Sequence, residues 1–211
     1  MNFPNVDFKA IAREGLAKDL SIHNVRPEFK EMSIENRRAI ADNDRLPYHV
    51  MCMNVEGNIN IGVVIRNAHL FGAKSVVVMG RTRSDGRSEV GMGNYTDVIR
   101  IHSLNPDLSF DENIFINYIN ENNLFPIFVE TGGEMLGQFS WDEKMYAVKK
   151  QPIFILGNET TGIDENILNT RHLWSESFVV GIPMRGVGRS LNLGVASGVI
   201  MWDFVHNMGW M

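Results

Sequence analysis

The chain has 211 residues, of which 44% are hydrophobic and 21% are charged, and its formal net charge is −5 at pH 7. This composition is typical of a soluble globular protein and excludes a chain that is disordered throughout. The longest apolar run, at 193–202, is about half as long as a bilayer crossing, and the N-terminus lacks the apolar core of a signal peptide. The single cysteine, Cys52, excludes an intrachain disulfide and argues against a zinc site, so we expect a cytoplasmic protein.

Basic side chains outnumber acidic ones only between residues 48 and 100. Proteins that bind the phosphate backbone of nucleic acids rely on clustered lysine and arginine. Any basic surface of this chain is therefore expected to be local and to lie in that middle region.

The first 47 residues predict two helical segments. Asn5 is placed to cap the first of them, and Ser33 is placed to begin the second, which is rich in charge. We interpret residues 1–47 as a helical N-terminal extension and residues 48–211 as one globular domain.

From residue 48 onward, short apolar strands alternate with helical patterns. Strands are predicted at 48–54, 75–80, 125–130, 152–157 and 177–183, and helices at 59–71, at 112–122, after Asp164 and from Ser190 onward. Near-continuous apolar strands separated by helices are typical of an α/β fold with a parallel sheet covered on both faces. In such sheets ligands bind at the carboxyl ends of the strands, so we expect a site in the loops that follow them.

Three of these loops carry polar residues, and the first is NINIGVVIRNAHLFGA at 58–73. Asn58 or Asn60 is placed to cap the helix, and Arg66 lies off its apolar stripe. Two interpretations stay open here: a capped helix with a solvated arginine, or polar groups that belong to a site.

The second loop is GNETTGID, at 157–164, directly after a buried strand. It puts the Glu159 carboxylate at the end of the strand, and Gly162 suggests a close approach by another group. The loop lacks the lysine of a P-loop. Glu159 is either a functional carboxylate or a surface acid that favours the start of the next helix.

The third loop runs into the last helix, in GIPMRGVGRSLNLGVASGVIMWD at 181–203. Gly186 and Gly188 predict a flexible turn, and Ser190 is the expected N-cap of a helix that is buried nearly all round. Capping accounts for Ser190 but leaves Asn192 unexplained, because asparagine is a poor helix former.

Together and in this order, the three segments NINIGVVIRNAHLFGA, FILGNETTGI and IPMRGVGRSLNLGVASGVIMWDF resemble the three motifs of the SpoU/TrmH branch of the SPOUT RNA methyltransferases. The resemblance covers about residues 48–204. It implies a Rossmann-like α/β fold whose C-terminal segment forms a trefoil knot, a rare exception to unknotted topology. It also implies a homodimer, S-adenosylmethionine as methyl donor, no metal, and a ribose 2′-hydroxyl of tRNA or rRNA as acceptor.

The resemblance also assigns residues by motif position. It implies a catalytic group of Asn60, Arg66, Glu159, Ser190 and Asn192. It implies that the cofactor is held largely by main-chain groups, here of Glu130, Thr131, Leu156, Gly157, Ile182, Met184, Ser190 and Leu191. The chain departs from the family pattern at Glu130, where apolar or hydroxyl residues are more usual.

The RNA is expected to contact arginines. Residues 80–100 form the most arginine-dense loop, with Arg81, Arg83, Arg87 and Arg100, although a solvated loop is the alternative. The predicted RNA-binding residues are Arg66, Arg81, Arg83, Arg87, Arg185 and Arg189. Because a guanidinium essentially never deprotonates, our hypothesis is that Arg66 binds phosphate and stabilises the developing oxyanion, rather than acting as the base often assigned in the family.

Two other functions compete with this one. A knotted protein that binds cofactor and RNA without catalysis would lack Arg66, Glu159 or Asn192, and all three are present. A SPOUT methyltransferase acting on a base nitrogen or a small molecule does not usually combine Asn60 and Arg66 with the second and third motifs. A dinucleotide-binding oxidoreductase is disfavoured because no G-x-G-x-x-G follows the first strand.

Overall fold

The computed structural model describes residues 24–80, 84–104, 110–174 and 177–211. The predicted helix capped by Asn5 lies outside these residues. In chain order the elements are η2 (Pro27–Phe29), α3 (Ile34–Asn43), β1 (Leu46–Met53), α4 (Asn58–Leu70), β2 (Ala73–Met79), α5 (Gly86–Glu89), η3 (Met92–Tyr95), β3 (Asp97–Ile101), α6 (Glu112–Glu121), β4 (Leu124–Met135), α7 (Trp141–Tyr146), β5 (Gln151–Leu156), α8 (Glu165–Asn169), η4 (Thr170–Leu173), β6 (Phe178–Gly181) and α9 (Leu193–Asn207).

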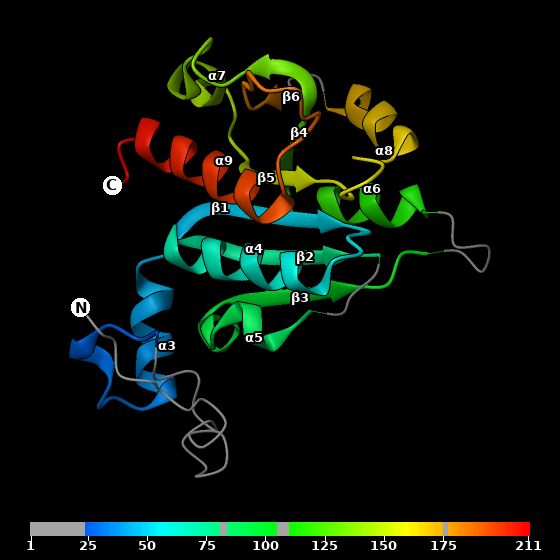
Figure 1. The fold of residues 1–211 in the computed structure, drawn as a ribbon. Coiled ribbons are helices and arrows are strands. Elements are labelled where there is room, and N and C mark those ends of the chain that lie inside the picture. The colour runs from blue at the N-terminus through cyan, green and yellow to red at the C-terminus, as the bar shows by residue number, and fades with distance from the viewer. Residues whose placement is uncertain (1–23, 81–83, 105–109, 175–176) are drawn as a thin grey trace.

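The strands form one six-stranded sheet in the order β3-β2-β1-β5-β4-β6. Every pairing is parallel; in the centre, His49 of β1 lies opposite Ser75 of β2 and Ile153 of β5. The predicted α/β fold with a parallel sheet is therefore confirmed. From β1 the chain first builds outward through β2 to β3, and β4 then begins the other half of the sheet (Figure 1).

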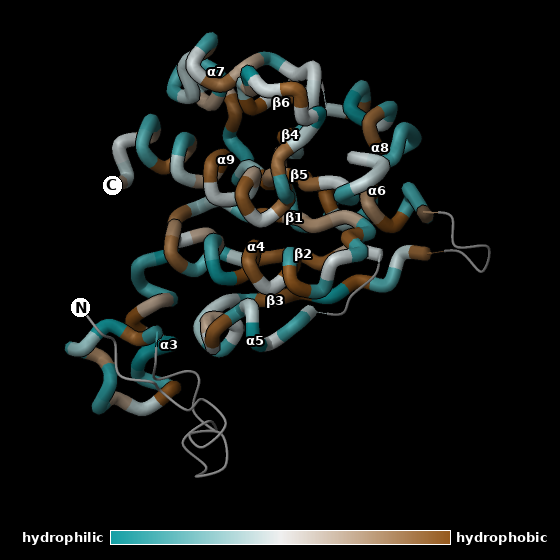
Figure 2. Tube along the Cα trace, viewed as in Figure 1, coloured by the Kyte–Doolittle hydropathy of each residue, from teal (hydrophilic) through white to brown (hydrophobic). Residues whose placement is uncertain are grey.

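Helices cover both faces of the sheet, as the predicted strand pattern requires. Val50 and Cys52 of β1 belong to a core cluster that includes side chains of α4 and α9. Met51 and Met53 alternate with them and belong to a second cluster, which includes side chains of α6 and α8. Figure 2 shows the hydrophobic stretches concentrated along the central strands between these layers. The near-continuous apolar character of β1 thus follows from its burial on two sides.

The described part of the N-terminal extension, from residue 24 onward, is held against the β3 edge of the sheet. Ser33 caps α3 by accepting a hydrogen bond from the backbone of Asn36 at 3.2 Å, as the sequence predicts. Arg37 is buried and donates to the hydroxyl of Tyr95 at 2.9 Å, and Arg38 forms an ion pair with Asp97. The second predicted helix is confirmed, and its arginines serve to attach it.

The last helix differs from the prediction in two respects. It begins at Leu193, and its N-cap is Asn192, not Ser190. It is also not buried all round, because Val195 is 53% exposed and Trp202 is 47% exposed in the single chain. The prediction failed because Ser190 and Asn192 are both good N-cap residues, and only the position of the helix against the sheet decides between them.

The arginine-rich segment at 80–100 is more structured than the predicted loop. It contains α5, η3 and the edge strand β3, and Arg100 lies within that strand. The pattern of β3 gave no strand signal because three of its five residues are exposed at the edge of the sheet. Arg81 and Arg83 lie outside the described residues.

Helices long and apolar enough to cross a membrane are not found in the described parts of the chain.

Candidate active site at the carboxyl ends of the strands

The candidate site lies where the order of strands reverses. β1 and β5 are neighbours in the sheet, but the chain leaves β1 toward β2 and leaves β5 toward β6, on the opposite side. Two loops that diverge in this way leave a crevice at the carboxyl ends of the strands, which is where α/β proteins bind ligands. The loop after β1 and the loop after β5 therefore meet in a favourable place for a site.

Glu159, in the loop after β5, joins these two loops. Its Oε1 accepts hydrogen bonds from Asn60 Nδ2 at 2.7 Å and from the backbone N of Gly57 at 3.0 Å. Its Oε2 accepts one from the backbone N of Glu56 at 3.1 Å. Partial burial disfavours the charged form, but these hydrogen bonds outweigh it and hold the pKa of Glu159 below its usual value. Glu159 is thus an ionised acceptor at neutral pH, well suited to orient Asn60 and poorly suited to act as a general base.

Asn60 does not cap α4, which corrects one of the two open interpretations. The helix begins at Asn58 after Gly57, which has no side chain with which to cap it. Glu159 supplies the missing acceptor at this end of the helix through its hydrogen bonds to Glu56 and Gly57. A carboxylate is favoured there, because the helix N-terminus carries unsatisfied N–H groups and a partial positive charge.

Asn192 extends the same network across to α9. Its Nδ2 donates to Asn60 Oδ1 at 3.0 Å, while its Oδ1 accepts from the backbone N of Gly194 at 2.9 Å. The chain Glu159–Asn60–Asn192 therefore connects residues from all three predicted motifs. Asn192 caps the helix with its carbonyl group and positions Asn60 with its amide group, which explains a residue that the sequence left unexplained.

Asn158 holds the loop after β5 in shape. Its backbone exchanges two hydrogen bonds with Gly162, both at 2.9 Å. Its side chain accepts from the backbone N of Thr160 at 2.8 Å and donates to the carbonyl of Asn54 at 2.9 Å. Asparagine is favoured at such a turn because its side chain bonds to the backbone two residues further on, and this signal in the sequence could have identified Asn158.

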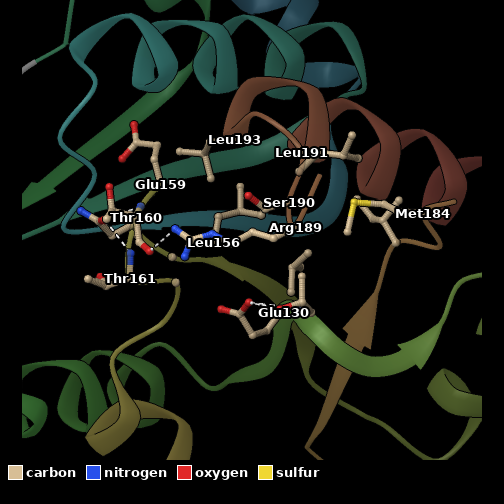
Figure 3. Close-up of a pocket in the computed structure, with 17 residues that line it drawn as sticks. Glu130, Leu156, Glu159, Thr160, Thr161, Met184, Arg189, Ser190, Leu191 and Leu193 are labelled. Atoms are coloured by element: carbon tan, nitrogen blue, oxygen red, sulfur yellow. Dashed lines mark hydrogen bonds between the residues drawn. The ribbon is translucent and has the colours of Figure 1, made fainter. Parts of the chain in front are cut away.

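A cavity of about 290 Å³ opens beside this network, between the middle of β4 and the carboxyl ends of β5 and β6. All eight residues expected at the cofactor line it: Glu130, Thr131, Leu156, Gly157, Ile182, Met184, Ser190 and Leu191. Glu159 also lines it, whereas Asn60 and Asn192 are not among the lining residues and connect to it through Glu159. Figure 3 shows Thr160 and Thr161 on one side of the cavity, Met184 and Leu191 on the other, and Glu130 below them.

Sequence reasoning missed several residues of this cavity. Arg189, which was assigned to RNA, lines the cavity and donates to the carbonyl of Thr160 at 3.0 Å. The other lining residues without an earlier assignment are Val129, Asn158, Thr160, Thr161, Gly162, Leu193 and Ala196. Most of them are small or apolar, so their types carried no signal before the loops were seen together.

The part of the chain that matches known proteins contains all three motifs. Residues 47–202 match the model of the SpoU rRNA Methylase family. The chain belongs to this family. A comparison with curated protein sequences found no match.

Solved structures of SpoU proteins share the fold. The SpoU methyltransferase AviRb from Streptomyces viridochromogenes, in complex with AdoMet, is 22% identical with a TM-score of 0.60, over 78% of this chain and 58% of that one. The TrmH/SpoU tRNA modifying enzyme of A. aeolicus is 16% identical with a TM-score of 0.60, over 83% of this chain and 84% of that one. A structure described as an RNA 2′-O ribose methyltransferase is 21% identical with a TM-score of 0.57, over 78% of this chain and 57% of that one. The chain thus spans little more than half of two of these three structures.

The arginine of the first SpoU motif, Arg66, does not join the Glu159 network within this chain. It lies six residues after Asn60, which on a helix is roughly 9 Å along the axis and about 240° around it. Its guanidinium donates to Asn24 Oδ1 at 3.5 Å, in the N-terminal extension. Within this chain Glu159 is therefore paired with Asn60 and not with Arg66.

Of the other predicted RNA contacts, Arg87, Arg185 and Arg189 are exposed, and Arg81 and Arg83 lie outside the described residues. Arg185 and Ser190 lie in the exposed loop before α9, and Arg87 is paired with Asp85 at 2.7 Å on the surface. Across the described residues, no three His, Cys, Asp or Glu side chains come together in a way that could hold a metal ion.

Proposed function

We propose that this SpoU chain is an S-adenosylmethionine-dependent RNA methyltransferase that methylates a ribose 2′-hydroxyl of tRNA or rRNA in the cytoplasm. The observation that carries the proposal is the cavity lined by all eight expected cofactor residues, with the Glu159–Asn60–Asn192 network at its side. The AdoMet-bound structures of AviRb and of an rRNA methyltransferase from Sinorhizobium meliloti support the choice of cofactor.

The cavity suits this cofactor chemically. Apolar side chains of Leu156, Ile182 and Leu191 offer surface to an adenine ring, and the loop after β5 offers main-chain groups. Gly157 allows that loop to fold tightly, because a Cβ on it would lie 2.2 Å from the carbonyl carbon of Gly162. A pocket with an apolar lining and a few polar groups that fix orientation is typical of cofactor sites.

When bound, S-adenosylmethionine supplies a methyl group on a sulfonium: the oxygen–carbon bond forms as the sulfur–carbon bond breaks, and the sulfur keeps the electron pair. The 2′-hydroxyl proton passes to a phosphate or to water. The chain's own task is alignment, because orientation of two reactants accounts for much of the barrier in such a displacement. In our proposal Asn60, fixed from both sides by Glu159 and Asn192, and Ser190 on the lining orient the ribose and the cofactor.

Arg66 has a separate role in this proposal. It binds the phosphate next to the target ribose and stabilises negative charge on the attacking oxygen, since a guanidinium is an unsuitable base. Its position on α4, away from Glu159, fits a residue that engages RNA rather than cofactor. Arg81, Arg83, Arg87, Arg185 and Arg189 are proposed to contact the RNA as well.

A homodimer and a trefoil knot complete the proposal. Helices α4 and α9 pack together on one face of the sheet and expose apolar side chains: Ile59 is 61% exposed, Val195 53% and Trp202 47%. Exposed apolar side chains on adjacent helices favour a partner surface. The loop before α9 reaches Thr160 through Arg189, and α9 then returns to α4, a path that supports a knotted C-terminus.

The direct test supplies the purified protein with methyl-labelled S-adenosylmethionine and RNA from a strain that lacks the gene. The tRNA and rRNA fractions are assayed separately, and nucleosides are identified by mass spectrometry. We expect label in a 2′-O-methyl nucleoside of one fraction. Label only in a methylated base would replace the ribose assignment, and cofactor binding with no labelled RNA or small molecule would favour the non-catalytic alternative.

A second test separates the roles within the site. We expect Arg66→Lys to lower the rate strongly, because lysine loses the bidentate contact with phosphate, and Glu159→Gln to lower it by releasing Asn60. Full methylation by Arg66→Lys together with none by Glu159→Gln would show that these roles are wrongly assigned.

A further inference from the structure

The Glu130 carboxylate on the cavity lining is held in place by hydrogen bonds from neighbouring residues. Its Oε2 accepts a hydrogen bond from the backbone N of Ile163 at 2.9 Å. Its Oε1 accepts from the backbone N of Thr131 at 2.8 Å and from the Thr131 hydroxyl at 3.1 Å. Glu130 lies within β4, just past the last residue that pairs with β5, and it therefore ties this part of β4 to the loop after β5. Both segments line the same cavity.

Gly162 lies next to this carboxylate and leaves room for it, because glycine has no side chain. Gly162 has φ +72°, and a Cβ on it would lie 2.4 Å from Glu130 Oε2. The backbone conformation therefore favours glycine, and a larger residue would push the Glu130 carboxylate out of its place. The side chain of Glu130 is thus held in place by its neighbours and belongs to the cavity lining.

The hydrogen bonds leave acceptors but no donors at this point of the cavity. A carboxylate offers about four acceptor positions, and three are taken, which leaves one on Oε2. The Thr131 hydroxyl gives its proton to Glu130 and keeps lone pairs of its own. Two consecutive residues, Glu130 and Thr131, therefore present two neighbouring acceptors on the cavity lining.

This pair of acceptors matches one part of the proposed cofactor. The ribose of S-adenosylmethionine has two hydroxyl donors on adjacent carbons, whereas the edge of adenine presents acceptors beside its amino group. We infer that the Glu130 carboxylate, with the Thr131 hydroxyl, binds the ribose 2′- and 3′-hydroxyls of the cofactor and so favours a ribosyl ligand over its deoxy forms. The inference rests on the proposed function and adds a side-chain contact to a site otherwise formed by main-chain groups.

The experiment is isothermal titration with four ligands. S-adenosylhomocysteine is the complete adenosyl ligand, 5′-methylthioadenosine lacks the amino-acid part, and the 2′-deoxy and 3′-deoxy forms of 5′-methylthioadenosine each lack one hydroxyl. We expect Glu130→Gln to weaken S-adenosylhomocysteine and 5′-methylthioadenosine equally, by roughly 10- to 100-fold, as loss of a hydrogen bond to a charged group predicts. In the same variant, the loss of affinity caused by removing a hydroxyl from the ligand should be smaller than in the wild type.

Thr131→Val is the second variant, because it removes one acceptor while the bond from Ile163 to Glu130 remains. In this variant we expect one of the two deoxy ligands to lose less affinity, relative to 5′-methylthioadenosine, than it does in the wild type. Glu134→Gln is the matched control: Glu134 is also on β4 but pairs with Lys144 outside the cavity, so its affinities should equal those of the wild type. Thermal unfolding of each variant shows whether the fold is kept.

Each other outcome has a distinct meaning. If Glu130→Gln weakens S-adenosylhomocysteine but not 5′-methylthioadenosine, the carboxylate binds the amino group of the cofactor and our inference is wrong. If folded Glu130→Gln keeps all four affinities, Glu130 only joins the two loops and the inference is also wrong. If the wild type binds none of the four ligands, the proposed function itself fails.

Discussion

Two loops line the same cavity but are built in different ways. The loop at 157–163 is held by its own hydrogen bonds, including the exchange between Asn158 and Gly162 and the contact from Ile163 to Glu130. The loop at 182–192 is exposed from 183 to 192, and its described contact with the first loop is the hydrogen bond from Arg189 to Thr160. Folding alone therefore holds the first loop in shape. The second loop contributes little to stability, so its side chains are free to contact ligands.

The largest effect should come from adding one methyl group to the first loop. We expect Gly157→Ala to destabilise the protein by about 2–3 kcal/mol, because its Cβ would collide with the backbone of Gly162 and Ile163. For a chain of this size this corresponds to a fall in melting temperature of roughly 5–10 °C, measurable by calorimetry.

Gly188→Ala, in the second loop, is the matched control. A Cβ there would meet no heavy atom within 4 Å, so we expect an unchanged melting temperature. Equal destabilisation by the two substitutions would show that the two loops do not differ in the way described.

Asn192, where the second loop meets α9, should show an intermediate effect. We expect Asn192→Ala to cost about 1 kcal/mol by removing the N-cap, and Asn192→Ser to restore most of that stability. Serine cannot supply the amide donor to Asn60, so both variants should methylate RNA slowly. Full activity of Asn192→Ser in a methylation assay would contradict the positioning role of the amide.

Arginines of the second loop should affect RNA binding far more than stability. We expect Arg185→Ala to change the free energy of unfolding by less than about 0.5 kcal/mol, because the side chain is exposed. Its affinity for RNA should fall, and the dependence of affinity on salt should flatten. Arg171→Ala, an exposed arginine in η4, is the control and should bind RNA normally.

The smallest effect concerns the charge of Glu159 in the first loop. Its folded-state pKa is lowered from 4.5, so ionised Glu159 stabilises the protein above that pH, and the contribution is lost as the pH falls through the folded-state value. The difference in melting temperature between the wild type and Glu159→Gln should therefore be constant from pH 6 to 8 and shrink below about pH 4.5. A difference that grows on acidification would contradict the lowered pKa.

The sequence predicted buried elements well and exposed elements or main-chain contacts less well. Apolar runs and helical spacing predicted the strands and most helices, because burial on two faces leaves a strong local pattern. Edge strand β3 was missed since it is largely exposed, and the turn of Asn158 was missed although its residue types are characteristic. The residues at the cavity were found through their motifs, which keep small and apolar residues where main-chain groups face a ligand.

Local patterns in the sequence predicted the parallel α/β fold, the N-cap at Ser33 and the three loops that carry the site. Three features became evident only from the packed chain: Glu159 pairs with Asn60 rather than Arg66, Asn192 rather than Ser190 caps α9, and Glu130 reaches the loop after β5. The reason is that fold class follows from periodicity, which is local. These three choices depend instead on strand register and on the rotation of each helix about its axis, and packing between distant segments sets both.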